Sequence, residues 1–219
     1  MKKTLLVASI LVTGLFAWAE GPCEKSISIN FSGGQRSDNH VCPMSGSETY
    51  GAYPVVGDNW NNVPTHVTTG LTGLKDGEGH VLEGVTESNT TGCNWSLGAG
   101  ASANNIFYGY LDDGSTTTLT GLTHENGFSS TFTVYVYFSN DGSNTFTPLA
   151  VNGVEYTFAD GVVKQGSTAW GSNSYSKNNS LVLGGDYLKV ENVTMPADGT
   201  LVIAPKTGIP GARCGIAAI

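Results

Sequence analysis

Charged side chains are scarce in this sequence of 219 residues, because Asp, Glu, Lys and Arg make up only 13% of it. The usual share in soluble domains is about a quarter, so this composition argues against a coiled coil or a long surface helix. Basic residues are scarcer than acidic ones: 10 lysines and arginines stand against 18 aspartates and glutamates, which gives a formal net charge of -8. Nucleic acid is therefore not an expected partner, since phosphate binding requires clustered lysine and arginine side chains.

Long hydrophobic runs are also missing, apart from one over residues 5–19 that follows Lys2-Lys3. This run is shorter than the roughly 20 residues that a membrane-spanning helix needs. A basic start, an apolar centre and the small residues of Ala17-Trp18-Ala19 are the layout of a secretory signal peptide. We expect residues 1–19 to be this signal peptide and the mature protein to be secreted or at the cell surface, without a membrane span. A retained N-terminal anchor is the alternative.

Cysteine is rare, and the four cysteines all follow the predicted signal peptide. An even number of cysteines in an oxidising compartment favours disulfides, although reduced thiols are the alternative. The sequence has no Cys-x-x-Cys pair and no Cys or His pair at helical metal spacing, so a zinc site is not expected. The disulfide candidates are Cys23, Cys42, Cys93 and Cys214, and three pairings are open.

Helical patterns are absent after the signal peptide, whereas apolar and polar residues alternate repeatedly. Residues 26–31 alternate strictly and predict a half-buried strand. Residues 131–138 alternate more strongly, with apolar groups on both faces, and predict a central strand. The dipeptides Asn152-Gly153 and Asp160-Gly161 predict tight hairpin turns. Further strands are expected over residues 71–75, 81–87, 106–110, 116–120, 149–151, 154–156, 187–190, 200–204 and 214–219.

The fold class predicted by this pattern is all-β, as an antiparallel β-sandwich or barrel. No fixed-period repeat and no proline-rich or charged linker divides the chain, so residues 20–219 are expected to form one domain. The longest stretch without a clear strand is residues 33–62, which contains Pro43 and Pro54. A loop of this length usually has packing of its own or a function.

Two segments of the sequence, residues 29–35 and 59–62, are similar to a known domain. The sequence resembles an uncharacterised jelly-roll domain of the galactose-binding-like kind, found in large secreted bacterial surface proteins. The resemblance implies a jelly-roll β-sandwich, often one module of a longer chain, and no catalytic residues to transfer. It also implies a last strand that continues beyond Ile219, and hence a domain truncated at its C-terminus or a fragment of a longer multidomain protein. Other matching segments are residues 108–112, 135–137, 151–153, 187–190 and 215–219.

The implied jelly roll bears on the disulfides, because its first and last strands lie side by side and antiparallel. The end of the first strand then lies near the start of the last one. Cys42 follows the first strand and Cys23 precedes it, so Cys42 is the better partner for Cys214, which opens the last strand.

Motifs for catalysis are also lacking. The four histidines are far apart, and there is no Gly-x-Ser-x-Gly elbow and no glycine-rich phosphate loop before a helix. No motif marks a pair of carboxylates, so we do not expect an enzyme. No cofactor is expected, although Asp112-Asp113 and Asp141 lie in turns where they could offer oxygens to a structural calcium ion. Ordinary turn capping is the alternative for these acids.

Aromatic residues are the best candidates for ligand binding. Sugar rings stack their C–H faces on aromatic planes, while amide side chains bond the hydroxyls. Trp60 lies in the segment Asp58–Asn62, and Trp170 is followed by Asn173 and Tyr175. Packing is the favoured alternative for Trp60, whereas Trp170 is expected to be more exposed than Trp95.

These observations predict a non-catalytic extracellular β-sandwich module that binds a glycan or another cell-surface component. A structural or adhesive spacer in a larger surface protein is the main alternative. A fragment of a polysaccharide-active enzyme is the third.

Overall fold

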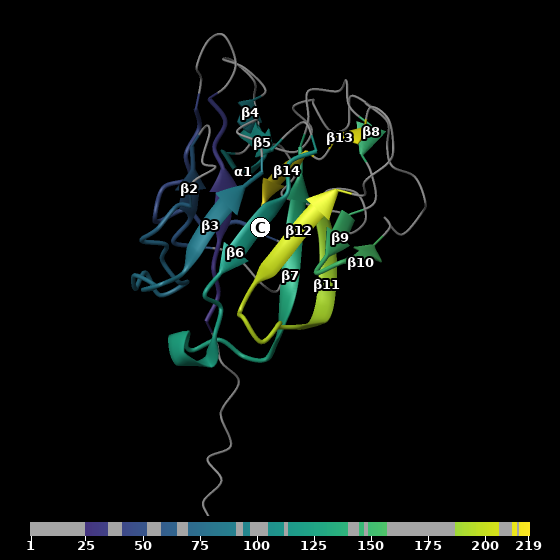
Figure 1. Cartoon of the computed structure of the whole chain (residues 1–219). Helices are drawn as coiled ribbons and strands as arrows, with labels where there is room; N and C mark the ends of the chain where they lie inside the picture. Colours follow the sequence, from purple (N-terminus) through teal and green to yellow (C-terminus); the bar gives the residue numbers. More distant parts are fainter. Residues whose placement is uncertain are drawn as a thin grey trace, which may run out of the picture.

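The chain forms two β-sheets that face each other, as seen in a computed structural model (Figure 1). Both sheets are mostly antiparallel, consistent with the β-sandwich that the sequence predicts. None of the helices in the described part of the chain is long and apolar enough to cross a membrane. The structure describes residues 25–34, 41–51, 58–64, 70–90, 94–96, 105–111, 114–139, 145–146, 149–156, 187–205, 212–213 and 215–219.

The first sheet has the strand order β11-β7-β14-β1-β2, and β5 joins it beside β14 with β4 on its far side. β1 and β14 pair in antiparallel fashion, so the first and last described strands are neighbours, as expected. β1 and β2 are parallel, which the sequence did not predict. The strands are β1 (Ile29–Phe31), β2 (Asn61–Val63), β4 (Asn94–Ser96), β5 (Gly109–Leu111), β7 (Thr131–Phe138), β11 (Tyr187–Thr194) and β14 (Ile216–Ala218).

The second sheet has the order β10-β9-β12-β6-β3 and lies across the first in Figure 1. Its strands are β3 (Thr86–Asn89), β6 (Thr117–Thr120), β9 (Leu149–Val151), β10 (Val154–Tyr156) and β12 (Leu201–Pro205). A small parallel pair joins β8 (Thr145–Phe146) to β13 (Ala212–Arg213). The described helices are the short α1 (Asn105–Tyr108) and the 3-10 turn η1 (His124–Asn126).

The alternation along β7 creates two hydrophobic clusters, one on each face of the first sheet. Val134 and Val136 belong to the main core, which also contains Leu119 and Ile203 of the second sheet. Tyr137 belongs to the second cluster, on the opposite face of β7. Period-two patterning therefore places β7 in contact with apolar groups on both faces, as a central strand requires.

Two elements confirm the sequence patterns closely. β7 has the bounds predicted for the central strand, residues 131–138. The hairpin between β9 and β10 turns at Asn152 and Gly153, whose φ angles of 48° and 78° lie in the left-handed region. Primed hairpin turns require such angles, and Asn-Gly accepts them at little cost.

The prediction of a strand over residues 106–110 is wrong in its first half. Residues 105–108 form the helical turn α1, and the strand starts only at Gly109. Ile106, Phe107 and Tyr108 are consecutive and all buried. Burial of three neighbours does not decide between helix and strand, because β1 and β5 also bury three consecutive residues.

The prediction of a strand over residues 71–75 is also wrong, since Leu71 and Lys75 form only isolated bridges. The stretch of residues 33–62, expected to lack strands, includes the start of β2. Asn61 also joins β2 to residue 75, because its side-chain amide donates to the Lys75 carbonyl (2.8 Å) and its Oδ1 accepts from the Lys75 N–H (2.7 Å). A side chain thus supplies bonds that an apolar strand pattern would not reveal.

Several sequence predictions concern residues outside the described part of the chain. No disulfide is seen between described residues, which include Cys42. The Cys42 N–H donates to the Ser32 carbonyl (3.0 Å), which places this cysteine beside the end of β1. The predicted signal peptide, Cys23, Cys93, Cys214 and the turn at Asp160-Gly161 lie outside the described residues.

Candidate functional site

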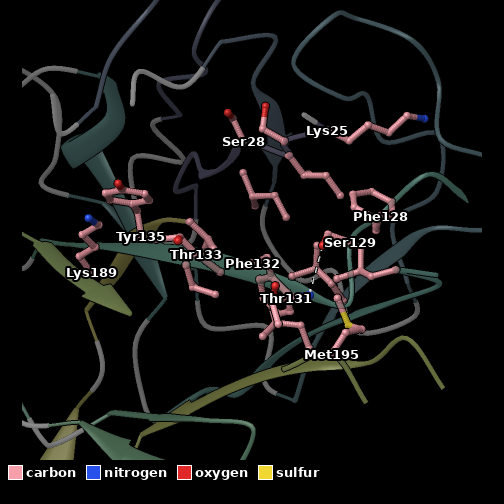
Figure 2. A pocket seen from close by; sticks show the side chains of 18 of the residues that line it. Lys25, Ser28, Phe128, Ser129, Thr131, Phe132, Thr133, Tyr135, Lys189 and Met195 are labelled. Atoms are coloured by element: carbon pink, nitrogen blue, oxygen red, sulfur yellow. Dashed lines mark hydrogen bonds between the residues drawn. The ribbon is translucent and has the colours of Figure 1, made fainter. Parts of the chain in front are cut away.

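A pocket of about 360 Å³ opens between residues 25–29 and β7 (Figure 2). Ile219 lines it, and so do Leu119 and Leu201 of the opposing sheet. The pocket therefore passes through the plane of the first sheet and reaches the core between the sheets. Its volume lies at the lower end of the range typical of ligand-binding pockets, roughly 300–1,000 Å³.

The side chains around this pocket include hydrophobic groups that are only partly buried. Ile27, Phe132, Met195 and Ile219 pack against the main core but remain partly accessible. Burial of apolar surface stabilises a folded protein by about 25 cal/mol for each Å² removed from water, so large apolar side chains are usually fully buried. The core is thus open at this place, and an occupant could bury further apolar surface here.

Three tyrosines cover the outer face of the first sheet next to the pocket. Tyr187 of β11 lies opposite Tyr137 of β7, and its ring centroid is 5.9 Å from that of Tyr137. The Tyr187 ring also stacks on Tyr135, at 6.2 Å and an interplanar angle of 28°. Tyr137 is buried, whereas Tyr135 and Tyr187 are half-buried. We call Tyr135, Tyr137 and Tyr187 the tyrosine ladder.

A lysine extends the tyrosine ladder on the same face. Lys189 lies opposite Tyr135 in the strand register, and its Nζ is 6.0 Å from the centre of the Tyr135 ring. This distance suits an attraction between the ammonium group and the aromatic face. Lys189 also forms an ion pair with Glu191 at 2.5 Å. Aromatic planes, an ammonium donor and a carboxylate acceptor are therefore adjacent beside the pocket.

Trp60, predicted as a candidate binding residue, lies just before β2 with only 7% of its surface exposed. Its ring belongs to the second hydrophobic cluster and also lines the pocket. The indole Nε1 is buried and has no hydrogen-bond partner in the described structure. A buried donor without a partner costs about 1–3 kcal/mol, so this group would gain from an acceptor.

The amides around Trp60, which the sequence offered as sugar-hydroxyl partners, bond to the protein itself. Asn59 donates to the Gly77 carbonyl (2.7 Å), and Asn62 donates to the Met44 carbonyl (2.8 Å). These bonds fix the loop conformation and use part of the hydrogen-bonding capacity of the amides. Binding by Trp60 stays a prediction.

The remaining sequence candidates lie outside the pocket or outside the described residues. Trp95 is partly buried and packs against the second hydrophobic cluster. Trp170, Asn173 and Tyr175, together with the proposed calcium ligands Asp112-Asp113 and Asp141, lie outside the described residues.

A turn with three possible metal ligands lies at Asp76, Glu78 and His80, which the sequence analysis did not single out. The His80 Nδ1 is 3.7 Å from Asp76 Oδ2 and 3.3 Å from Glu78 Oε2. Asp76 Oδ1 accepts the backbone N–H of Glu78 (3.0 Å) and of His80 (2.9 Å). Burial alone would raise the pKa of Asp76, but these two hydrogen bonds and the charges of His80 and Lys25 outweigh it and lower the pKa. The alternate spacing Asp-x-Glu-x-His was the signal available in the sequence.

Glu87 on β3 is a fully buried acid in the second sheet. Burial raises its pKa from the ordinary 4.5 to about 7, against the opposing effect of a hydrogen bond from Thr117. The Thr117 hydroxyl donates to Glu87 Oε1 at 2.9 Å. This bond links β3 to β6 within the second sheet.

Comparisons of the chain with protein-family models, with curated proteins and with solved structures find no match.

Proposed function

We propose that this protein is a non-catalytic extracellular module that binds a glycan on the outer face of β7 and β11. The observation that carries this proposal is the stacked pair of Tyr135 and Tyr187 beside the pocket. Both rings are half-buried, so each is held in place by packing while part of its surface stays accessible. A rigid aromatic plane is suited to the C–H face of a sugar ring.

Charged groups beside the rings supply the polar half of such a site. Lys189 can donate hydrogen bonds to sugar hydroxyls, and Glu191 can accept them. The two side chains form an ion pair next to the Tyr135 ring. Export to the cell surface or the medium, inferred from residues 1–19, would bring this face into contact with extracellular glycans.

We also propose a specific topology for the β-sandwich. We infer a jelly roll of the galactose-binding-like kind, the domain of bacterial surface proteins that the sequence resembles. The neighbouring positions of β1 and β14 in the first sheet support this topology.

The alternative function is a structural or adhesive spacer in a larger surface protein. Burial of many described aromatic side chains favours it, because Trp60, Tyr108 and Tyr110 have at most 7% of their surface exposed. A spacer would use these rings only for packing.

A glycan-array screen of the mature protein, followed by calorimetric titration of the best glycan, tests the proposal. We expect Tyr135→Ala to weaken binding at least tenfold, because the stacking plane is lost. Tyr135→Phe keeps the ring and should bind within about threefold of the unchanged protein. Tyr156→Ala, on the second sheet, controls for general effects of removing a half-buried tyrosine. Absence of any array signal, or equal affinity of the Tyr135→Ala variant, would favour the spacer.

A further inference from the structure

The turn at residues 76–80 brings three metal-ligating side chains together on alternate residues. Asp76 Oδ2, Glu78 Oε2 and His80 Nδ1 all lie within 4.8 Å of one another. The His80 nitrogen is 3.3 Å from the Glu78 oxygen and 3.7 Å from the Asp76 oxygen. Ligands bound at about 2.0–2.1 Å in a tetrahedron around zinc are about 3.3–3.4 Å apart. Small shifts of these side chains therefore allow the three atoms to share one ion.

One oxygen of the Asp76 carboxylate is buried without a hydrogen bond. Asp76 is only 1% exposed, and its Oδ2 has no hydrogen-bond partner in the described structure. Its ion-pair contacts are Lys25 Nζ at 3.8 Å and His80 Nδ1 at 3.7 Å. Both distances exceed the roughly 2.7–2.9 Å of a charge-assisted hydrogen bond. Because a buried charge is costly unless it is closely paired or coordinates a metal, a cation nearer to this oxygen would stabilise it.

Neighbouring segments hold the backbone of the turn in place. The Gly77 N–H donates to the Ser26 carbonyl (2.9 Å), and the Asn59 side chain donates to the Gly77 carbonyl (2.7 Å). The other oxygen of Asp76, Oδ1, accepts the backbone N–H groups two and four residues further along the chain. These two bonds fix the orientation of the carboxylate and draw the other two ligand residues around it. A site that is ordered before the ion arrives loses less entropy on binding.

The other two ligands can adjust to an ion. The side chains of Glu78 and His80 are 79% and 71% exposed, so each can change its rotamer with little resistance from packing. Their exposure also leaves one side of the site open to solvent. Water can then supply the fourth ligand, as it does in zinc sites that have three protein ligands.

The donor atoms favour zinc over calcium or magnesium. Calcium and magnesium prefer oxygen ligands, whereas an imidazole nitrogen suits zinc and its neighbours in the first transition row. Histidine binds such metals through either ring nitrogen, and the Nδ1 of His80 faces both carboxylates. The charges of Asp76 and Glu78 balance the two positive charges of the ion.

We propose that Asp76, Glu78 and His80 bind one divalent cation of the zinc type, with water completing the coordination. The bound ion joins the start of the turn to its end and gives the buried oxygen of Asp76 a close partner. None of the three ligands lines the pocket or belongs to the tyrosine ladder, so this site is separate from the proposed glycan site.

Lys25 competes with an ion at this site. Its ammonium group is 3.8 Å from Asp76 Oδ2, and it is the one lysine that forms an ion pair with the turn among the described residues. Figure 2 shows its side chain directed away from the pocket. Since like charges repel, Lys25→Met should strengthen zinc binding by about threefold or more. Equal or weaker binding by this variant would place the ion away from Asp76 Oδ2 and overturn the proposed site.

Calorimetric titration of the metal-free mature protein with zinc chloride is the direct test. We expect saturable binding that is weakened by about tenfold or more in His80→Ala and in Glu78→Gln, because each variant loses a ligand. His124→Ala and Glu83→Gln are the matched controls, since both residues are exposed and lie outside the turn. These controls should bind zinc within about twofold of the unchanged protein. Calcium chloride should bind about tenfold or more weakly than zinc chloride.

Melting temperatures separate this site from zinc held by cysteine thiols. Zinc should raise the melting temperature of the unchanged protein and of His124→Ala, but not that of His80→Ala. Because the His80 side chain is exposed, its replacement should leave the melting temperature of the metal-free protein unchanged. Absence of zinc binding would overturn the proposal. Equal zinc affinity of His80→Ala and the unchanged protein would also overturn it, because the ion would then be held elsewhere.

Discussion

Ile29 and Ile219 donate their backbone N–H groups to each other's carbonyl oxygens, at distances of 2.9 and 3.0 Å. This reciprocal pair joins β1 to the residue after β14 in the middle of the first sheet. The side chains of both residues contact the main core. The last residue of the sequence thus contributes both hydrogen bonds and apolar contacts to a central position.

Deletion of Ile219 should lower the free energy of unfolding by about 2–4 kcal/mol, because two backbone hydrogen bonds and a partly buried side chain are lost. Ile219→Ala keeps the backbone bonds and should cost only about 1–2 kcal/mol. Urea unfolding of the two variants measures the difference. Equal losses would show that the side chain, rather than the backbone pair, stabilises this position.

Gly109, the first residue of β5, should not tolerate a side chain. A Cβ added here would overlap the Phe31 carbonyl oxygen and the Gly33 nitrogen, which are backbone atoms of a neighbouring strand and its end. We expect Gly109→Ala to cost at least about 3 kcal/mol or to prevent folding.

Gly153→Ala is the matched control, because a Cβ there meets open space and only the left-handed φ of 78° is strained. Its expected cost is about 1 kcal/mol. Thermal melts of the two variants compare them directly, and similar melting temperatures would contradict the close approach at Gly109.

Glu87 should make the protein less stable as the pH rises from about 4.5 to 7. Burial raises its pKa in the folded protein to about 7 from the ordinary 4.5. The folded state therefore holds a proton over this range that the unfolded state has released. Stability from this group is complete below pH 4.5 and falls by up to roughly 3 kcal/mol before it levels off above pH 7.

Glu87→Gln removes this titration while keeping an oxygen for the Thr117 hydroxyl. The variant should therefore gain stability relative to the unchanged protein between pH 5 and pH 8. Urea unfolding at both pH values gives the difference, in which effects of other titrating groups cancel. Parallel profiles for the two proteins would refute the raised pKa.

Asp76 should act in the opposite direction. Its pKa is lowered in the folded protein, because the backbone hydrogen bonds and nearby positive charges outweigh the effect of burial. Its contribution is thus present above the ordinary value of 3.8 and is lost as the pH falls through the lowered pKa. Asp76→Ala removes the acceptor for two backbone N–H groups and should cost about 1–3 kcal/mol at pH 7.

Asp76→Asn separates the hydrogen bonds from the charge, because its amide oxygen can still accept them. We expect it to cost less than Asp76→Ala at pH 7. The difference between Asp76→Asn and the unchanged protein should shrink as the pH falls from 7 to below 3.8, toward the lowered pKa of the carboxylate. A constant difference over this pH range would show that the charge does not contribute.

Prediction of secondary structure from the sequence was most accurate where a single local pattern determines the structure. The alternation over residues 131–138 requires a strand with two covered faces, and Asn152-Gly153 requires left-handed backbone angles. Prediction failed at residues 106–108, where a helical turn replaces the strand that their residue types suggest. It also failed for β2, which pairs in parallel with β1 through backbone hydrogen bonds between residues distant in sequence.

The sequence by itself therefore determined the all-β class, the central strand and the hairpin, because side-chain period and turn chemistry are local properties. The candidate site was decided by the tertiary structure alone. Tyr135 and Tyr187 become neighbours through the register of β7 and β11. Strand register and relative strand length depend on pairings between residues distant in sequence, which no local pattern records.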